Sequence, residues 1–171
     1  ADMVDGKSMP FLQQYTESNQ SFTQHFSGGN QFRTGMFSLL YGLQGSYGDA
    51  RIFNSTSPLM TRSFQQAGYE LGLFLPETNL NLRSSQAMFN DFNPVIAKET
   101  NGSADADLHT VASFNEWHSI QNKPWFALVN LKAPENFDTP VGFLGIETVK
   151  ADPALMPAQK VLFNQYRQSL Y

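Results

Sequence analysis

Residues 57–75 read SPLMTRSFQQAGYELGLFL, and this stretch decides the fold class. Ser57 followed by Pro58 is typical of a helix start, and Gly68 is typical of the position just past a helix end. The apolar run over residues 69–75 predicts a strand that is buried on both faces. A helix, a glycine and an apolar strand in this order form the usual unit of a parallel sheet. The sequence therefore predicts an α/β fold.

The same alternation continues on both sides of this unit. Ser8 as a cap and Pro10 in the first turn predict a short helix that begins near residue 11. Pro94 confines its strand to a sheet edge or to the first positions of a strand. Residues 139–156 show no periodicity and are interpreted as a long loop. The remaining expected elements are a helix at 11–18, a strand at 21–26, a short helix within 84–92, a strand at 93–99, a helix at 104–122, a strand at 125–131 and a helix at 156–171.

Residues 25–48, HFSGGNQFRTGMFSLLYGLQGSYG, contain a glycine pair that leads into a helix-spaced apolar run. Gly28 and Gly29 allow close backbone approach and positive φ angles. The first turn of a helix has unpaired N–H groups and a partial positive charge, so it suits a phosphate or sulfate ester. An ordinary turn before a helix is the alternative. The predicted anion-binding residues are Gly29, Asn30, Gln31, Arg33 and Thr34.

The sequence of this segment, SGGN followed by TGMFSLLYGLQGSY, resembles the periplasmic sulfatase-like domain of the YejM/PbgA family of inner-membrane proteins. That family lies within the alkaline phosphatase and sulfatase superfamily. The likeness extends to MPFLQQYTESNQSFTQHFS, SFQQAGYELGLFL and PWFALVNLKAPENFD. The resemblance implies a doubly wound, mostly parallel sheet with helices on both faces. Residues 1–171 would then be a single sulfatase-like domain that is incomplete, or truncated, at both ends.

Active members of the superfamily cleave or transfer phosphate or sulfate esters with divalent metal. The resemblance places Phe32 at the nucleophile position, and a phenyl ring cannot attack phosphorus. Thr34 is a weak candidate, because two helical steps turn its hydroxyl about 200° away. The guanidinium of Arg33 suits anion binding better than metal binding. The strands that carry metal ligands in the family have no counterpart here, so we expect no metal site and no cofactor in this chain. A divalent metal is compatible with the complete domain.

Several titratable residues have open interpretations. Glu135 stands where active relatives often carry histidine, and both it and Asp138 are either metal ligands or solvent-facing loop acids. A ligand role for His25 is weighed against a packed or surface residue. Asp105 and Asp107 are expected to interact with a helix dipole. His109 and His118 would project about 180° apart on one helix, so they cannot share a metal.

Composition excludes several classes of protein. The chain has no cysteine, which excludes disulfides, thiolate catalysis and the modified cysteine of true sulfatases. A formal net charge of −4 argues against nucleic-acid binding, which normally needs a basic face. No apolar run approaches the roughly 20 residues of a membrane span. Membrane anchoring of a parent protein is therefore an expectation from the resemblance alone.

The resemblance implies a domain on the periplasmic side of the inner membrane that acts in outer-membrane lipid homeostasis. It would bind an anionic lipid, such as lipopolysaccharide or cardiolipin, or an envelope protein, and as a pseudoenzyme it would lack efficient catalysis. The alternatives are a metal-dependent phosphatase, sulfatase or phosphoglycerol transferase, and a pure docking module. The chain alone is expected to be inactive. A half-built sheet has an open edge, which predicts self-association or domain exchange.

Overall fold

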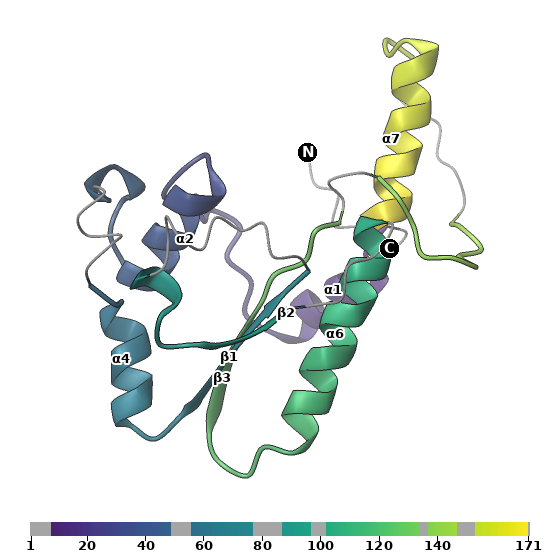
Figure 1. Cartoon of the computed structure of the whole chain (residues 1–171). Coiled ribbons are helices and arrows are strands. Elements are labelled where there is room, and N and C mark those ends of the chain that lie inside the picture. Colours follow the sequence, from purple (N-terminus) through teal and green to yellow (C-terminus); the bar gives the residue numbers. More distant parts are fainter. Residues whose placement is uncertain are drawn as a thin grey trace. The chain divides into compact units, whose positions relative to one another are not determined.

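The computed structural model describes residues 8–48, 56–76, 87–96, 102–133, 137–146 and 153–170 (Figure 1). The chain divides into two compact units. We call residues 24–97 and 110–130 the sheet unit, and residues 1–23, 98–109 and 131–171 the terminal unit. The elements in chain order are α1 (Pro10–Ser18), α2 (Phe32–Tyr41), η1 (Gly45–Tyr47), α4 (Leu59–Gln66), β1 (Glu70–Leu75), β2 (Asn93–Ile96), α6 (Ser103–Ser119), β3 (Trp125–Val129) and α7 (Pro157–Leu170).

The sheet unit is built on three parallel strands in the order β2-β1-β3. Gly72 of β1 lies level with Asn93 of β2 and with Ala127 of β3. The central strand β1 is buried from Leu71 to Leu75. A central strand that is buried from its second residue onward, with parallel neighbours, confirms the α/β class that the sequence predicts.

The two faces of the sheet bury different side chains, because successive strand residues point to opposite sides. Leu71, Leu73 and Leu75 belong to a core cluster that includes Phe37 and Leu40 of α2. The other members of this cluster are Met88, Phe89 and Phe92. One face of β1 is therefore covered by side chains of α2 and of residues 88–92.

The opposite face of β1 packs against α6. The ring of Phe74 lies 5.5 Å from that of Phe114 and 5.4 Å from that of Trp117, both edge to face. Gly72 makes this approach feasible, because a Cβ there would lie 3.2 Å from the Trp117 ring. Within the sheet unit, α2 and α4 lie on one side of the strands and α6 lies on the other (Figure 1). The expectation of helices on both faces holds for this small sheet.

The predicted strand at 21–26 is wrong, since these residues form turns and irregular backbone. All six are exposed, including Phe22 at 73% and Phe26 at 86%, and no described strand pairs with them. An alternating pattern becomes a strand only where a neighbouring strand and a face to bury are available.

Two predicted helix caps are also wrong. The residue before α1 is Met9, and the Ser8 hydroxyl instead accepts a hydrogen bond from Arg167 Nε at 3.0 Å. The residue before α4 is Pro58 rather than Ser57. Gly68, with a φ of +81°, takes the left-handed conformation that the sequence predicts just past this helix.

Helix α6 exposes some of its apolar residues and buries a polar one. Leu108 is 55% exposed and Val111 is 40% exposed, whereas Thr110 is buried. The described parts of the predicted loop, residues 139–146 and 153–156, contain no helix or strand. Residues 147–152 lie outside the described residues, and the single-domain assignment stays a prediction.

Candidate functional site

The glycine pair before α2 fits closely against the helix that follows it. A Cβ at Gly28 would lie 1.7 Å from Ser38 Oγ, and a Cβ at Gly29 would lie 2.1 Å from Thr34 Oγ1. The carbonyl of Gly28 accepts the N–H of Gly45 at 3.0 Å. The space that a Cβ would need at each glycine is therefore taken by the helix that follows. Neither glycine is among the described residues with a positive φ, although this residue type allows it.

The Thr34 hydroxyl is held by the backbone of the residue before the helix. Its oxygen donates to the carbonyl of Gln31 at 3.0 Å and accepts the N–H of Gln31 at 3.4 Å. This contact belongs to a capping box, in which the residue before the helix and the third helical residue each bond the backbone of the other through a side chain. A hydroxyl used in this way stabilises α2, and it is a poor starting point for attack on a phosphate.

The remaining predicted residues surround the first turn of α2. Asn30 and Gln31 are exposed, and Arg33 is half-buried. The ring of Phe32, the first residue of the helix, is 45% exposed. The first helical hydrogen bond runs from Gly35 N–H to the Gln31 carbonyl at 2.9 Å, and the Gln31 side chain accepts the N–H of Thr34, so Gln31 and Thr34 cap the start of the helix reciprocally. The structure brings the predicted anion-binding residues together at one helix start.

A second group of polar contacts lies in the terminal unit, where Asp107 holds the backbone just past β3. Its carboxylate accepts the N–H groups of Lys132 and Ala133, each at 2.7 Å. Asp107 is 8% exposed. The sequence predicts a helix-dipole partner here, and the structure shows in addition that the side chain fixes the backbone of Lys132 and Ala133.

Asp138 caps the same helix from a distant part of the chain. Its carboxylate accepts hydrogen bonds from the Ser103 hydroxyl and, at 3.2 Å, from the Ala104 N–H. Burial tends to raise the pKa of Asp138, but these hydrogen bonds outweigh it and lower the pKa below the ordinary 3.8. Gly102 makes room for the carboxylate, because a Cβ there would lie 2.5 Å from it. Asp138, which is partly exposed, is thus engaged as the cap of α6.

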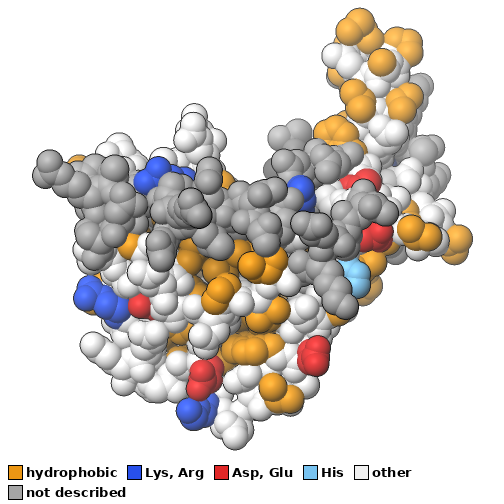
Figure 2. All heavy atoms as spheres, in the orientation of Figure 1, with side chains coloured by type: hydrophobic (Ala, Val, Ile, Leu, Met, Phe, Trp, Pro, Cys, Tyr) orange, Lys and Arg blue, Asp and Glu red, His pale blue; other side chains and the backbone are white. Residues whose placement is uncertain are grey.

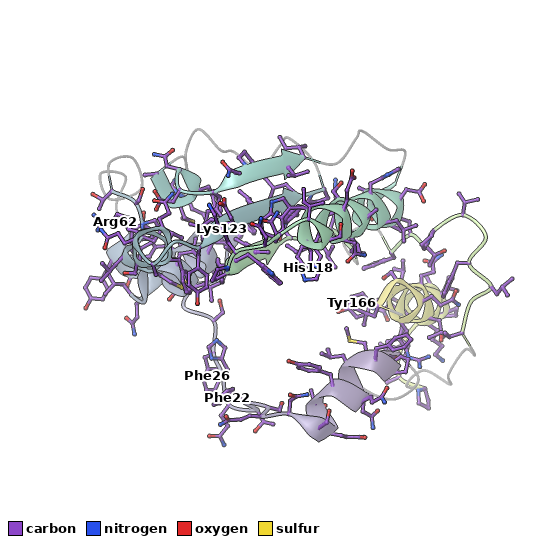
Figure 3. All side chains as sticks on the ribbon, turned by 90° about the horizontal axis from the view of Figure 1, so that it is seen from below. Phe22, Phe26, Arg62, His118, Lys123 and Tyr166 are labelled. Carbon is purple, nitrogen blue, oxygen red and sulfur yellow. The ribbon has the colours of Figure 1, made fainter. Side chains whose placement is uncertain are left out.

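The remaining ligand candidates do not converge among the described residues. His25 and His109 are exposed, and Glu135 lies outside the described residues. His118 projects from the last turn of α6 (Figure 3), where its ring lies 5.0 Å from that of Trp125. No group of three or more histidine, aspartate or glutamate side chains that could hold a metal forms in the described part of the chain.

One polar cluster in the sheet unit was missed at the sequence level. Asp91 accepts a hydrogen bond from the Thr61 hydroxyl at 2.6 Å, and the Tyr41 hydroxyl donates to the carbonyl of Thr56. Burial raises the pKa of Tyr41, the nearby Asp91 raises it further, and Arg62 opposes both. These contacts join α2, α4 and the segment before β2. Because these residues lie far apart in the sequence, no short motif indicates that they form a cluster.

The fold and the site together define an α/β protein with a small parallel sheet and a glycine-rich turn that opens a helix. No family model matches the chain. It is 29% identical over 143 residues to an uncharacterized protein of Haemophilus influenzae, covering 80% of this chain and 24% of that protein.

The chain is also homologous to "Inner membrane protein YejM" of Salmonella typhimurium. The two are 29% identical over 127 residues, covering 72% of this chain and 21% of YejM. The YejM protein of Salmonella typhi matches to the same extent. The chain therefore spans about a fifth to a quarter of the length of these curated relatives. No helix among the described residues has the length and apolar character to cross a membrane.

Proposed function

We propose that this chain is a sulfatase-like domain of an inner-membrane protein, on the periplasmic side, and that it binds the phosphate of an anionic lipid without efficient catalysis. The homology to YejM, which is named as an inner membrane protein, supports the membrane association. Lipopolysaccharide and cardiolipin are the lipids that the family resemblance implies. An envelope protein with an anionic surface is a further partner of the same site, in the homeostasis of outer-membrane lipids.

The observation that carries the binding part of this proposal is the first turn of α2. Its N–H groups and the macrodipole favour an anion, and Arg33 in the same turn adds a full positive charge. Asn30 and Gln31 are exposed beside it and offer amide donors. A phosphate at this position would receive charge-assisted hydrogen bonds, which are the stronger kind.

The weak-catalysis part rests on two side chains. Phe32 occupies the first helical position and offers no nucleophilic atom. The Thr34 hydroxyl is bound to the backbone of Gln31, so attack would first require the loss of this cap. A site that keeps anion-binding groups but lacks a ready nucleophile is suited to binding.

A metal-dependent hydrolase or transferase of phosphate or sulfate esters is the alternative. It would need carboxylates and histidines that converge on the ester, and the described residues provide no such group. The donors present here do not fit a divalent metal, so we derive no catalytic step through one.

The experiment is co-sedimentation of the chain with vesicles that contain phosphatidylglycerol or cardiolipin, and with vesicles of phosphatidylcholine alone. We expect binding to the anionic vesicles that weakens as salt rises, because exposed charges are screened. Equal affinity for both kinds of vesicle would contradict an anion-specific site. Metal-stimulated hydrolysis of an aryl phosphate or aryl sulfate would favour the alternative.

A further inference from the structure

Two carboxylates join the start of α6 to the described residues 131–133 and 137–138, which we call the segment after β3. Asp107 of α6 accepts the N–H groups of Lys132 and Ala133, each at 2.7 Å. In the other direction, Asp138 of the segment accepts the N–H of Ala104 in the first turn of α6 at 3.2 Å. All of these residues belong to the terminal unit. The helix and the segment therefore each supply one acid and each bind one.

The residue before α6 explains why the helix takes an acid from elsewhere in the chain. Ala106 N–H donates to the Gly102 carbonyl at 3.2 Å, so Gly102 occupies the cap position. Glycine has no side chain that could accept the N–H groups of the first turn, as serine or aspartate does at this position. The Asp138 carboxylate lies 2.5 Å from the place that a Cβ at Gly102 would take. Asp138 thus supplies the side-chain cap that Gly102 lacks.

Phe137, the residue before this acid, has a strained backbone. Its φ of +56° lies in the left-handed region, which bulky residues rarely adopt. Such a conformation persists where contacts on both sides hold it. On one side Asp138 is bonded to Ser103 and Ala104, and on the other the Phe137 ring lies 5.5 Å from the Tyr166 ring, edge to face. Loss of the Asp138 contacts would let Phe137 leave the left-handed region, which favours an open segment.

The two carboxylate contacts lie close enough along α6 to depend on each other. Ser103 and Asp107 are four residues apart, so they lie one turn apart on the same face of the helix. Apolar packing holds the sheet unit, and hydrophobic side chains are visible in Figure 2 over the region where its strands lie in Figure 1. That packing is non-directional, whereas hydrogen bonds weaken steeply as their angle changes. A shift of the first turn of α6 therefore misaligns both carboxylate contacts.

We propose that the Asp107 and Asp138 contacts form a single latch, so that the start of α6 and the segment after β3 open and close together. Open α/β sheets bind ligands outside the carboxyl ends of their strands, and residues 131–133 follow the carboxyl end of β3. The latch gives this end of the strand a closed state and an open state. A ligand that binds the open segment more tightly would also loosen the first turn of α6. This inference does not depend on the anion site at α2.

Amide hydrogen exchange of the 171-residue chain, resolved by residue with NMR, tests the latch because exchange reports local opening. Asp138→Ala removes the acid that bonds to Ala104. We expect the amides of Lys132 and Ala133, which bond to Asp107 instead, to exchange about tenfold faster or more in this variant. Asp107→Ala should in turn speed exchange at Ala104 by a similar factor. The amides of β1 report global unfolding and should not change.

Asp105→Ala is the matched control, because Asp105 is an acid in the same first turn of α6. It should change exchange at Lys132 and Ala133 by less than about twofold. The double variant Asp107→Ala/Asp138→Ala should exchange no faster than the faster single variant, because contacts within one cooperative unit are not additive.

Two results would overturn the proposal. One is faster exchange at Ala104 in Asp138→Ala with Lys132 and Ala133 unchanged, which would make Asp138 an ordinary local cap. The other is an effect of Asp105→Ala as large as that of Asp138→Ala. If the β1 amides of Asp138→Ala also exchange faster, Ser103→Ala, which removes a single hydroxyl from the latch, is judged by the same criteria.

Discussion

Asp138 lies 35 residues beyond Ser103, yet its carboxylate accepts the Ser103 hydroxyl hydrogen at the first turn of α6. The helix thus receives its cap from the segment that follows β3. We expect Asp138→Ala to lower the free energy of unfolding by about 1 kcal/mol, as loss of a cap commonly does. Urea denaturation measures this. Asp105→Ala, which removes an acid from the same turn, should have a smaller effect.

The same contact makes stability depend on pH in a known direction. Because the pKa of Asp138 is lower in the folded chain than its ordinary 3.8, the carboxylate stabilises the fold fully above that value. The stabilisation is lost as pH falls through the lower folded pKa. We expect Asp138→Asn to flatten the pH dependence of unfolding in this acid range. An Asp138→Asn profile parallel to that of the wild type would argue against the contact.

Asp107 should be the more costly acid to remove. Its carboxylate accepts two backbone N–H groups and is largely buried, so Asp107→Ala leaves both donors without this acceptor. We expect a loss of about 2 to 4 kcal/mol, from two hydrogen bonds to a charged group. Thermal and urea unfolding measure the change. A loss no larger than that of Asp105→Ala would contradict the assigned role.

Glycine is required at position 28 for steric reasons. A Cβ there would overlap Ser38, at 1.7 Å from Oγ and 2.3 Å from Cβ, so Gly28→Ala should destabilise the fold by about 1 to 3 kcal/mol. Gly35→Ala is the control. Its Cβ would lie 3.4 Å from Ser27 Oγ, and alanine favours a helix by up to about 1 kcal/mol. The two variants should therefore change the urea midpoint in opposite directions.

Catalysis by this chain is expected to be undetectable. Aryl phosphate and aryl sulfate should show no turnover above the metal-free control with magnesium, manganese, calcium or zinc, because Phe32 has no nucleophile and Thr34 is used as a cap. If turnover is observed, Thr34→Ala shows whether this hydroxyl is responsible. Metal-stimulated turnover that Thr34→Ala abolishes would make the chain an enzyme.

The sequence predicts those parts of the fold that local patterns determine. The mainly apolar run at 69–75 indicated β1. Pro94 indicated a sheet edge or the first positions of a strand, and in the described sheet it is the second residue of the outer strand β2. The strand expected at 21–26 was wrong, because alternation alone does not show whether a partner strand exists. The exposed Leu108 and buried Thr110 of α6 likewise depend on what packs against the helix.

The site was predictable only in part for the same reason. The grouping of Asn30, Gln31 and Arg33 at a helix start follows from their adjacency in the sequence. The contacts of Asp107 with Lys132 and of Asp138 with Ser103 join residues 25 and 35 positions apart. Only the folded chain brings these partners together. The anion-binding role itself is still a prediction.

The most direct test of that role is the affinity for vesicles with phosphatidylglycerol, measured by co-sedimentation for wild type, Arg33→Ala and Lys123→Ala. The two variants remove the same charge, but Lys123 lies two residues before β3 and pairs with Glu70 at 3.1 Å, whereas Arg33 lies in the first turn of α2. We expect Arg33→Ala to weaken binding about tenfold, equivalent to 1.4 kcal/mol, and Lys123→Ala to change it less than twofold. Equal affinity of Arg33→Ala and wild type would contradict an anion site at the start of α2.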